Sequence, residues 1–271
     1  NMDSSNATGM PIAIMDSGIG GLSVLSEIRN LLPQEALIYI ADSAYAPYGE
    51  RSAEQILARC QKIADWADRQ GCKALVLACN TATAYAADEL RAAHALPIIA
   101  MEPAIKPAVK ATQTGVIGVL ATTATLASER YARLLREHGP HVRVVSQACP
   151  GLAECIERGD WQGAALQSLL SQYLRPLLDA GADTIILGCT HYPLVRAEIE
   201  CIVGSDVSVI DSGAAVAAQV QRRLGTAALL SSQRMDTATK VYVKEPTDPV
   251  RQLIRSVAGQ DVSVIALNDL D

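Results

Sequence analysis

The sequence lacks both a long hydrophobic run and an excess of basic residues. Its apolar stretches fall well short of the roughly 18 to 20 residues that a membrane-spanning helix needs, so no membrane-embedded segment is expected. The chain has 23 lysines and arginines against 29 acidic residues, a net charge of −6. Because nucleic-acid binding calls for clustered Lys and Arg, the sequence has no footprint for such a partner.

Targeting signals and cross-linking patterns are missing as well. Residues 1–9 are polar and have no apolar core, which excludes a secretory signal; we expect them to be an expression remnant outside the fold, with Met10 as the natural start. The seven cysteines are odd in number and scattered, which favours free thiols in a reducing cytoplasm over disulfides. Neither C-x-x-C nor H-x-x-x-H occurs, so no metal site is expected.

The sequence does contain a regular alternation of short β-branched runs and longer amphipathic stretches. The runs are almost continuously hydrophobic, as in strands buried on both faces of a parallel sheet. One amphipathic stretch begins with a capping box, Ser52 and Gln55, and ends at Gly71, as a helix does. The fold class is therefore α/β. The predicted strands are 11–15, 36–41, 73–78, 97–101, 115–120, 142–146, 184–188, 207–210, 240–243 and 262–267.

The chain also divides into two similar halves. Four predicted strands precede residue 102, and four more lie between residues 115 and 210. In each half the third strand ends in a cysteine that follows a glycine by eight residues: Gly71 precedes Cys79, and Gly181 precedes Cys189. These matches indicate a duplicated α/β unit.

The duplication predicts two pseudo-symmetric, doubly wound, mainly parallel-sheet domains that face each other across a cleft. We expect residues 10–101 and 213–271 to form the first domain, with the last two strands added to its sheet. Residues 102–212 are expected to form the second domain.

Cys79 and Cys189 each follow a strand, where loops at the carboxyl ends of parallel strands bind ligands. A helix starting after each cysteine would direct N–H groups and its positive dipole end toward the thiol, which favours thiolate and attracts carboxylates. Two such groups on opposite sides of one carbon could remove a proton from one face and deliver one to the other. The alternative is that a cysteine is only a small buried hydrophobe. We assign that role to the other five, Cys60, Cys72, Cys149, Cys155 and Cys201.

Polar residues accompany both cysteines. Asn80, Thr81 and Thr190 offer hydrogen-bond donors for a carboxylate. His191 could orient or acidify Cys189, or it could be an ordinary loop histidine.

Two further loops are candidates for ligand binding. Asp16 and Ser17 begin DSGIGG, whose acid could hold a substrate ammonium; a glycine-rich turn could instead bind phosphate. The polar loop 41–52 contains Asp42 and Tyr48 and could close over a ligand or simply connect two elements.

Taken together, these motifs resemble those of the glutamate racemases of bacterial cell-wall synthesis. They occur in order from Met10 to about Leu224. The matching segments are DSGIGGLSVL (16–25), ADSAYAPYGERS (41–52), LACNTATA (77–84), EPAIKPA (102–108), TTAT (122–125), CPGLAECIE (149–157), ILGCTHYPL (186–194) and IDSGAA (210–215).

The resemblance implies a cytoplasmic homodimer that interconverts L- and D-glutamate without cofactor or metal and supplies D-glutamate for peptidoglycan. It makes Cys79 and Cys189 the opposed acid and base, with Cys79 acting on the D and Cys189 on the L enantiomer. Asp16 and His191 match residues that assist the thiols, and Asp42 and Glu157 match two further acids. Substrate contacts are implied for Asp16, Ser17, Tyr48, Gly49, Asn80, Thr81, Thr122, Thr125 and Thr190.

The chain departs from the family pattern in one place that affects the site. Leu152, Ala153 and Glu154 stand where Phe, Val and Pro are common, so either Glu154 or Glu157 could be the assisting acid. Three alternatives stay open at this stage. The substrate could be aspartate or a hydantoin, Cys189 with His191 could be the nucleophile of a hydrolase or transferase, or the chain could be a non-catalytic amino-acid sensor.

Overall fold

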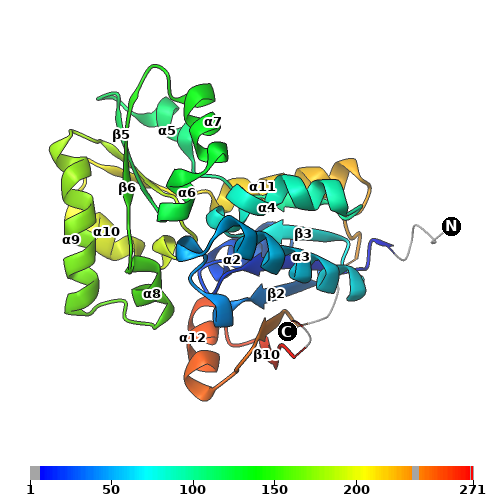
Figure 1. The fold of residues 1–271 in the computed structure, drawn as a ribbon. Coiled ribbons are helices and arrows are strands. Elements are labelled where there is room, and N and C mark those ends of the chain that lie inside the picture. The colour runs from blue at the N-terminus through cyan, green and yellow to red at the C-terminus, as the bar shows by residue number, and fades with distance from the viewer. Residues whose placement is uncertain (1–6, 234–237, 269, 271) are drawn as a thin grey trace. The chain divides into compact units, whose positions relative to one another are not determined.

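The computed structural model describes residues 7–233, 238–268 and 270. These residues form an α/β fold with two parallel sheets, as the hydrophobic runs predict (Figure 1). The chain divides into two compact units, each with its own sheet. Unit 1 comprises Asn1–Ala46, Ser52–Met101 and Gly213–Asp271, and unit 2 comprises Pro47–Arg51 and Glu102–Ser212.

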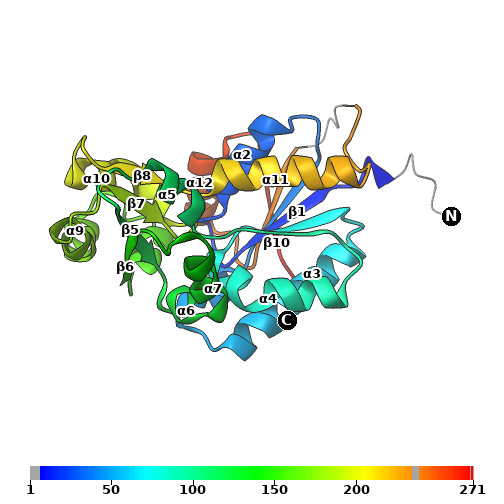
Figure 2. The same ribbon diagram turned by 90° about the horizontal axis from the view of Figure 1, so that it is seen from above.

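Unit 1 is a parallel sheet with helices on both faces. Its described strands are β1 (Ile12–Asp16), β2 (Leu37–Ala41), β3 (Ala74–Leu77), β4 (Ile98–Ala100), β9 (Lys240–Val243) and β10 (Ser263–Ala266). Its α-helices are α2 (Leu22–Leu31), α3 (Ala53–Arg69), α4 (Asn80–Ala93), α11 (Gly213–Thr226) and α12 (Asp248–Ala258), and a 3-10 turn η1 covers Ser43–Tyr45. Helices α2, α11 and α12 cover one face, and α3 and α4 cover the other (Figure 2). All residues of β1 and β2 are buried, because both strands are covered on both faces.

Unit 2 repeats this construction on a smaller scale. Its described strands are β5 (Val116–Ala121), β6 (Arg143–Ala148), β7 (Thr184–Leu187) and β8 (Ser208–Ile210). Its helices are α5 (Ile105–Ala111), α6 (Thr123–Ala127), α7 (Glu129–His138), α8 (Leu152–Glu157), α9 (Ala164–Asp179) and α10 (Arg196–Val203), with 3-10 turns η2 (Tyr48–Glu50) and η3 (Tyr192–Val195). One core lies under α8, α9 and α10, and a second core lies under α5 and α7.

The two sheets share one strand order. The strands run β10-β9-β2-β1-β3-β4 in unit 1 and β6-β5-β7-β8 in unit 2, all parallel. In both, the first strand of the set lies between the second and the third, which confirms the predicted duplication. This order creates a topological switch point between β1 and β3 and another between β5 and β7. Ligands of doubly wound sheets bind outside the carboxyl ends of the strands at such a point.

The local predictions agree well with the observed elements. Each predicted strand is confirmed to within two residues at either end, and β9 and β10 extend the first sheet beside β2 as expected. The capping box is formed: the Gln55 N–H donates to Ser52 Oγ, and the Ser52 N–H donates to Gln55 Oε1. Gly71, at φ +68°, follows the end of α3 in the left-handed region that favours glycine.

Three expectations are wrong. Strands β6 and β8 are only partly buried, because they are the edges of their sheet. Cys201 is exposed and not a core residue, since it lies on the outer side of α10. The N-terminal segment does not lie wholly outside the fold: Lys73 Nζ donates to the Thr8 carbonyl at 2.6 Å, while residues 1–6 lie outside the described residues.

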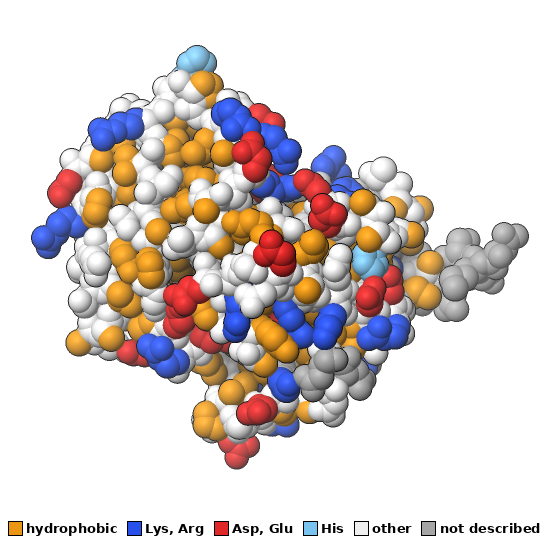
Figure 3. All heavy atoms as spheres, in the orientation of Figure 1, with side chains coloured by type: hydrophobic (Ala, Val, Ile, Leu, Met, Phe, Trp, Pro, Cys, Tyr) orange, Lys and Arg blue, Asp and Glu red, His pale blue; other side chains and the backbone are white. Residues whose placement is uncertain are grey.

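Surface and helix properties complete the description. None of the described helices is both long and apolar enough to cross a membrane. Within the described ranges, no group of three or more His, Cys, Asp or Glu side chains is arranged to hold a metal ion. On the face drawn in Figure 3, acidic and basic side chains are interspersed.

Candidate active site

Asp16 ends β1 and organises the loop that follows it. Its buried carboxylate accepts hydrogen bonds from the N–H groups of Gly18 and Gly21, both at 3.1 Å. The Tyr39 hydroxyl donates to the Gly18 carbonyl at 2.7 Å. A Cβ at Gly21 would lie 2.7 Å from Asp16 Cβ, so only glycine fits this close approach. Since Asp16 already occupies two amides of the glycine-rich turn, phosphate binding there is disfavoured.

Cys79 follows β3, on the other side of the same switch point. It is 5% exposed and is the N-cap residue of α4, where its sulfur accepts a hydrogen bond from the Ala82 N–H at 3.4 Å. The N-terminal, positive dipole end of α4 therefore lies beside the thiol, as predicted.

Asn80 is the first residue of α4, and its side chain is buried without a protein partner. Neither its Oδ1 nor its Nδ2 makes a hydrogen bond with any described residue. A buried polar group left without a partner costs about 1–3 kcal/mol, so native proteins rarely retain one without a reason. An unsatisfied amide next to a thiol at a switch point indicates a site for a polar ligand. Ser17 follows β1 and Thr81 is the second residue of α4, and both are buried.

In unit 2, Cys189 is part of a chain of three side chains. Its sulfur lies 3.9 Å from His191 Nδ1, and His191 Nε2 lies 2.5 Å from Glu157 Oε2 of α8. Cys189, Thr190 and His191 are all buried. Glu157, and not Glu154, therefore contacts the histidine.

The protonation of His191 follows from this chain. Burial by itself lowers the pKa of the imidazole, but hydrogen bonds to Cys189 and Glu157 and the charge of Glu157 outweigh it. The net result is that the pKa of His191 is raised well above its usual range. A protonated His191 therefore bridges the Glu157 carboxylate and the Cys189 sulfur.

The segment after Cys189 differs from the prediction. No α-helix starts there; instead, the backbone makes i→i+3 bonds from Tyr192 N to the Cys189 carbonyl and from Leu194 N to the His191 carbonyl. Pro193 has no N–H to continue an α-helix at this point, and α10 begins only at Arg196. His191 thus places a positive charge beside Cys189, whereas the positive end of the α4 dipole lies beside Cys79.

Glu154 lies one turn before Glu157 and belongs to a different pair. Burial raises the pKa of the half-buried Glu154 carboxyl, and the nearby Glu50 carboxyl raises it further. Glu50 is part of η2, so this acid pair connects α8 with the Pro-Tyr-Gly segment of the loop 41–52.

The Pro-Tyr-Gly segment packs on the loop that follows β5. A Cβ at Gly49 would lie 2.7 Å from Thr122 Cβ, so the contact requires glycine. Thr122 is the N-cap of α6. Its Oγ1 accepts a hydrogen bond from the Thr125 N–H at 3.2 Å, and its hydroxyl donates to Thr125 Oγ1 at 3.0 Å. Tyr48 is only 1% exposed. Gly49, Thr122 and Thr125 therefore lie together beside the carboxyl end of β5.

Asp42 does not join either cluster as a free acid. Its carboxylate receives two hydrogen bonds from Arg59, from Nε at 3.0 Å and from Nη2 at 2.7 Å. Asp42 therefore forms an ion pair with α3, and its role as an assisting acid stays a prediction.

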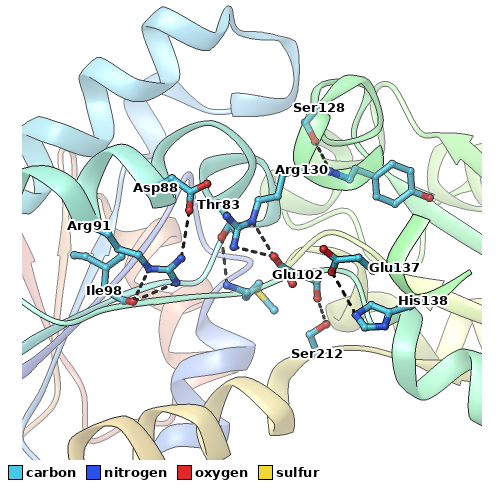
Figure 4. A network of polar contacts seen from close by, with 12 residues as sticks. Thr83, Asp88, Arg91, Ile98, Glu102, Ser128, Arg130, Glu137, His138 and Ser212 are labelled. Atoms are coloured by element: carbon cyan, nitrogen blue, oxygen red, sulfur yellow. Dashed lines mark hydrogen bonds and ion pairs between the residues drawn. The ribbon is translucent and has the colours of Figure 1, made fainter. Parts of the chain in front are cut away.

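The EPAIKPA motif marks where the chain passes from one unit to the other. Within unit 2, the Glu102 carboxylate binds Arg130 at 2.8 Å, and the Ser212 hydroxyl donates to the Glu102 carbonyl at 2.5 Å (Figure 4). Within unit 1, the Met101 N–H donates to Thr83 Oγ1 at 3.2 Å. These bonds hold the two crossing segments and involve neither cysteine.

A sequence model of the family described as Asp/Glu/hydantoin racemase matches residues 12–220. The chain belongs to this family. It is 55% identical over 259 residues to a glutamate racemase of Pseudomonas paraeruginosa. The matched region covers 95% of this chain and 97% of that protein. It is similar to the crystal structure of a glutamate racemase isoform from Bacillus anthracis, with a TM-score of 0.88, 33% identity and coverage of 96% and 98% of the two chains. A glutamate racemase from Francisella tularensis in complex with D-glutamate gives a TM-score of 0.84 at 29% identity, with 97% and 98% coverage.

Two residues of this racemase escaped the sequence interpretation. Arg59 breaks the apolar face of α3 between Ile56 and Ile63, and that interruption is the signal that could have revealed it. In the sequence, Tyr192 stands out only as part of the segment ILGCTHYPL (186–194). Its fully buried hydroxyl has a pKa raised well above its usual range by burial and by the neighbouring Cys149 and Cys189.

Cys149 itself fits the prediction of a buried hydrophobe. Burial raises the pKa of its thiol to about 12, so it stays neutral near Cys189.

Proposed function

We propose that this racemase interconverts L- and D-glutamate, with the thiols of Cys79 and Cys189 as opposed acid and base on a single substrate. The observation that carries the proposal is the equivalent position of the two sulfurs: each is buried and follows the third strand of its set, at the switch point of its own sheet. The glutamate racemases at 55% identity and in complex with D-glutamate support the substrate.

The two thiols are activated in different ways. Cys189, as thiolate beside protonated His191, takes the α-proton of L-glutamate, and Cys79 delivers a proton to the opposite face. In the reverse direction Cys79 is the base, helped by the Ala82 N–H and the dipole of α4. Glu157 acts through His191, by keeping it protonated and oriented.

The remaining residues bind glutamate and stabilise charge. The unpartnered amide of Asn80, with the hydroxyls of Thr81 and Thr190, donates to the α-carboxylate and takes up carbanionic charge as it develops. Asp16 and Ser17 hold the substrate ammonium. The side-chain end of glutamate is contacted by Tyr48, Gly49, Thr122 and Thr125.

The biological setting is part of the same proposal. We propose that the enzyme works in the cytoplasm as a homodimer and supplies D-glutamate for peptidoglycan. No cofactor is needed, because the donors around the α-carboxylate stabilise the carbanion. We also propose that residues 10–101 with 213–271 and residues 102–212 form the two domains, which differ from the two compact units only in the segment 47–51 and the N-terminal residues.

The decisive experiment incubates the enzyme with D-glutamate in D₂O without added cofactor. Optical rotation should fall to zero while the α-proton signal in the NMR spectrum disappears, as deuterium enters from solvent. Cys79→Ala and Cys189→Ala should each abolish racemisation. Cys60→Ala, which removes a buried thiol of α3, is the matched control and should remain active. Racemisation in either catalytic-cysteine variant would refute the two-thiol scheme.

A second candidate rests on the Cys189–His191–Glu157 chain, which is the arrangement of a nucleophile, a base and an orienting acid in cysteine hydrolases. Such an enzyme would release a product without deuterium exchange and would tolerate Cys79→Ala. It also leaves the buried amide of Asn80 without a role, which is why we rank it second.

A further inference from the structure

Arg59 is a buried arginine whose donors bind two separate segments of the chain. Its Nε and Nη2 bind the two oxygens of Asp42 at 3.0 and 2.7 Å, and its Nη1 donates to the Leu270 carbonyl at 2.9 Å. The guanidinium carbon lies 3.7 Å from the centre of the Tyr45 ring. The Arg59 and Asp42 side chains are 10% and 3% exposed.

This geometry depends on the shape of the guanidinium group. A planar fork can bind both oxygens of a carboxylate, donate sideways to a carbonyl and stack on an aromatic ring at once. A lysine ammonium at the same place would be a point charge without the fork or the stacking face. The four contacts therefore specify arginine and not merely a positive charge.

The Asp42–Arg59 pair closes the loop that carries the Pro-Tyr-Gly segment. Asp42 comes directly after β2, and its N–H donates to the Asp16 carbonyl at 3.0 Å. Arg59 lies two turns into α3, which starts after Ser52. Between these anchors the chain leaves unit 1 at Ala46, passes through η2 of unit 2 and returns at Ser52. The residues on either side of the segment 47–51 are thus joined within unit 1 by the Asp42–Arg59 pair.

We propose that Arg59 is a positioning residue of the racemase, which fixes the loop 42–52 through Asp42, Tyr45 and the Leu270 carbonyl and thereby holds Tyr48 and Gly49 for the substrate. The inference rests on the proposed function, in which those two residues contact the side-chain end of glutamate. It gives Asp42 a different role from the assisting acid that the family resemblance implies: its carboxylate holds the loop and exchanges no proton with the thiols.

A purely structural ion pair would make a different prediction from a positioning pair. Loss of a structural pair lowers stability and leaves the kinetics of the folded fraction unchanged. Loss of a positioning pair loosens the loop 42–52 and weakens substrate binding, while the thiol chemistry at the α-carbon continues. A structural role and a positioning role can therefore be distinguished by two measurements. One is whether KM changes while kcat does not, and the other is the rate of amide hydrogen exchange within the loop.

The test compares Arg59→Lys with Arg29→Lys. Arg29 is a matched control, because it too binds an aspartate, Asp261 at 2.6 Å, and a backbone carbonyl, that of Ala258 at 2.5 Å, yet it contacts no part of the loop 42–52 through these bonds. Amide hydrogen exchange is followed by mass spectrometry on the free enzymes, and KM and kcat are measured with D-glutamate. If Arg59→Lys does not fold, Asp42→Asn, which keeps the shape of the side chain, takes its place.

We expect Arg59→Lys to speed exchange in residues 43–51 and to raise KM about tenfold, equivalent to roughly 1.4 kcal/mol of binding, with kcat within about twofold of the parent enzyme. Arg29→Lys should change neither. Unchanged exchange in residues 43–51, or an unchanged KM, would overturn the inference even if the parent enzyme racemises glutamate. A parent enzyme that fails to racemise glutamate refutes the proposed function instead, and the exchange data alone then decide whether Arg59 holds the loop.

Discussion

Replacing Glu157 by glutamine tests whether the acid acts through His191. The substitution keeps the shape of the side chain and removes the charge from a hydrogen bond of 2.5 Å. The His191 and Glu157 side chains are 4% and 20% exposed, so solvent screens the pair only weakly. A hydrogen bond to a charged group contributes about 1.5–3 kcal/mol, which corresponds to a factor of about 10 to 150 in the population of protonated His191.

The direction of the pH effect follows from the sign of the shift. Hydrogen bonds to Cys189 and Glu157 raise the pKa of His191 despite its burial, so removing the Glu157 charge lowers that pKa. The imidazolium then loses its proton at lower pH, and the alkaline limb of the pH profile of kcat/KM moves to lower pH. Because its folded-state pKa is raised, His191 also adds stability below its unfolded pKa of about 6.5, and this stability is lost as pH rises through the folded value.

The assay measures kcat/KM by circular dichroism from both enantiomers of glutamate, between about pH 6 and pH 10. We expect Glu157→Gln to lower kcat/KM on the alkaline side by about 10- to 150-fold. The loss must be equal for L- and D-glutamate, since the two enantiomers have the same free energy.

Glu154→Gln is the matched control, one helical turn earlier in α8. Burial and the neighbouring Glu50 raise the pKa of Glu154, so its neutral form is favoured and glutamine imitates it. We expect this variant to keep the alkaline limb in place. If Glu154→Gln moves the limb and Glu157→Gln does not, the assignment of the assisting acid is wrong.

Three further predictions follow from single contacts. Asn80→Ala should raise KM for glutamate about tenfold or more without lowering the melting temperature, because the amide makes no hydrogen bond with any described residue that the substitution could break; a loss of stability would contradict this. Gly49→Ala should cost about 1–3 kcal/mol in the free energy of unfolding and raise KM, because its Cβ meets Thr122 at 2.7 Å; Thr122→Ser removes the methyl group at 2.8 Å and should restore part of both, and no restoration would refute the contact. Lys73→Met should cost about 3–5 kcal/mol in denaturant unfolding, because the buried Glu35 carboxylate loses its cationic partner at 2.5 Å and keeps only its bonds from Ser231. Adding Glu35→Leu should recover part of that loss. A loss that stays the same in the double variant would show that the pair itself stabilises the fold.

Much of this fold is determined locally and is therefore visible in the sequence. Continuous hydrophobic runs define the strands of a parallel sheet, since such strands are buried on both faces. The capping box at Ser52 and the stop at Gly71 act within a few residues, so they mark α3 directly. The matched spacing from glycine to cysteine in each half predicts the duplication that the strand orders display. The partial burial of the edge strands β6 and β8 could not be predicted, because the hydrophobicity of a strand does not indicate whether it has a neighbour on each side.

The candidate site divides in the same way. The positions of Cys79 and Cys189 after their strands follow from local pattern, and so does the cap that Cys79 makes on α4. The choice between Glu154 and Glu157 does not, because both lie on α8 and only packing against the segment after β7 brings one of them to His191. The partner of Asp42 lies 17 residues away on α3, and the carbonyl that completes the Arg59 contacts lies 211 residues away.

The sequence by itself thus determined the elements, their duplication and the two thiols, since each of these depends on residues close together in the chain. Tertiary structure decided which acid contacts His191, that the amide of Asn80 is left without a partner, and that Asp42 binds an arginine. These are contacts between distant segments, and their energies depend on burial and direction, which no local pattern records.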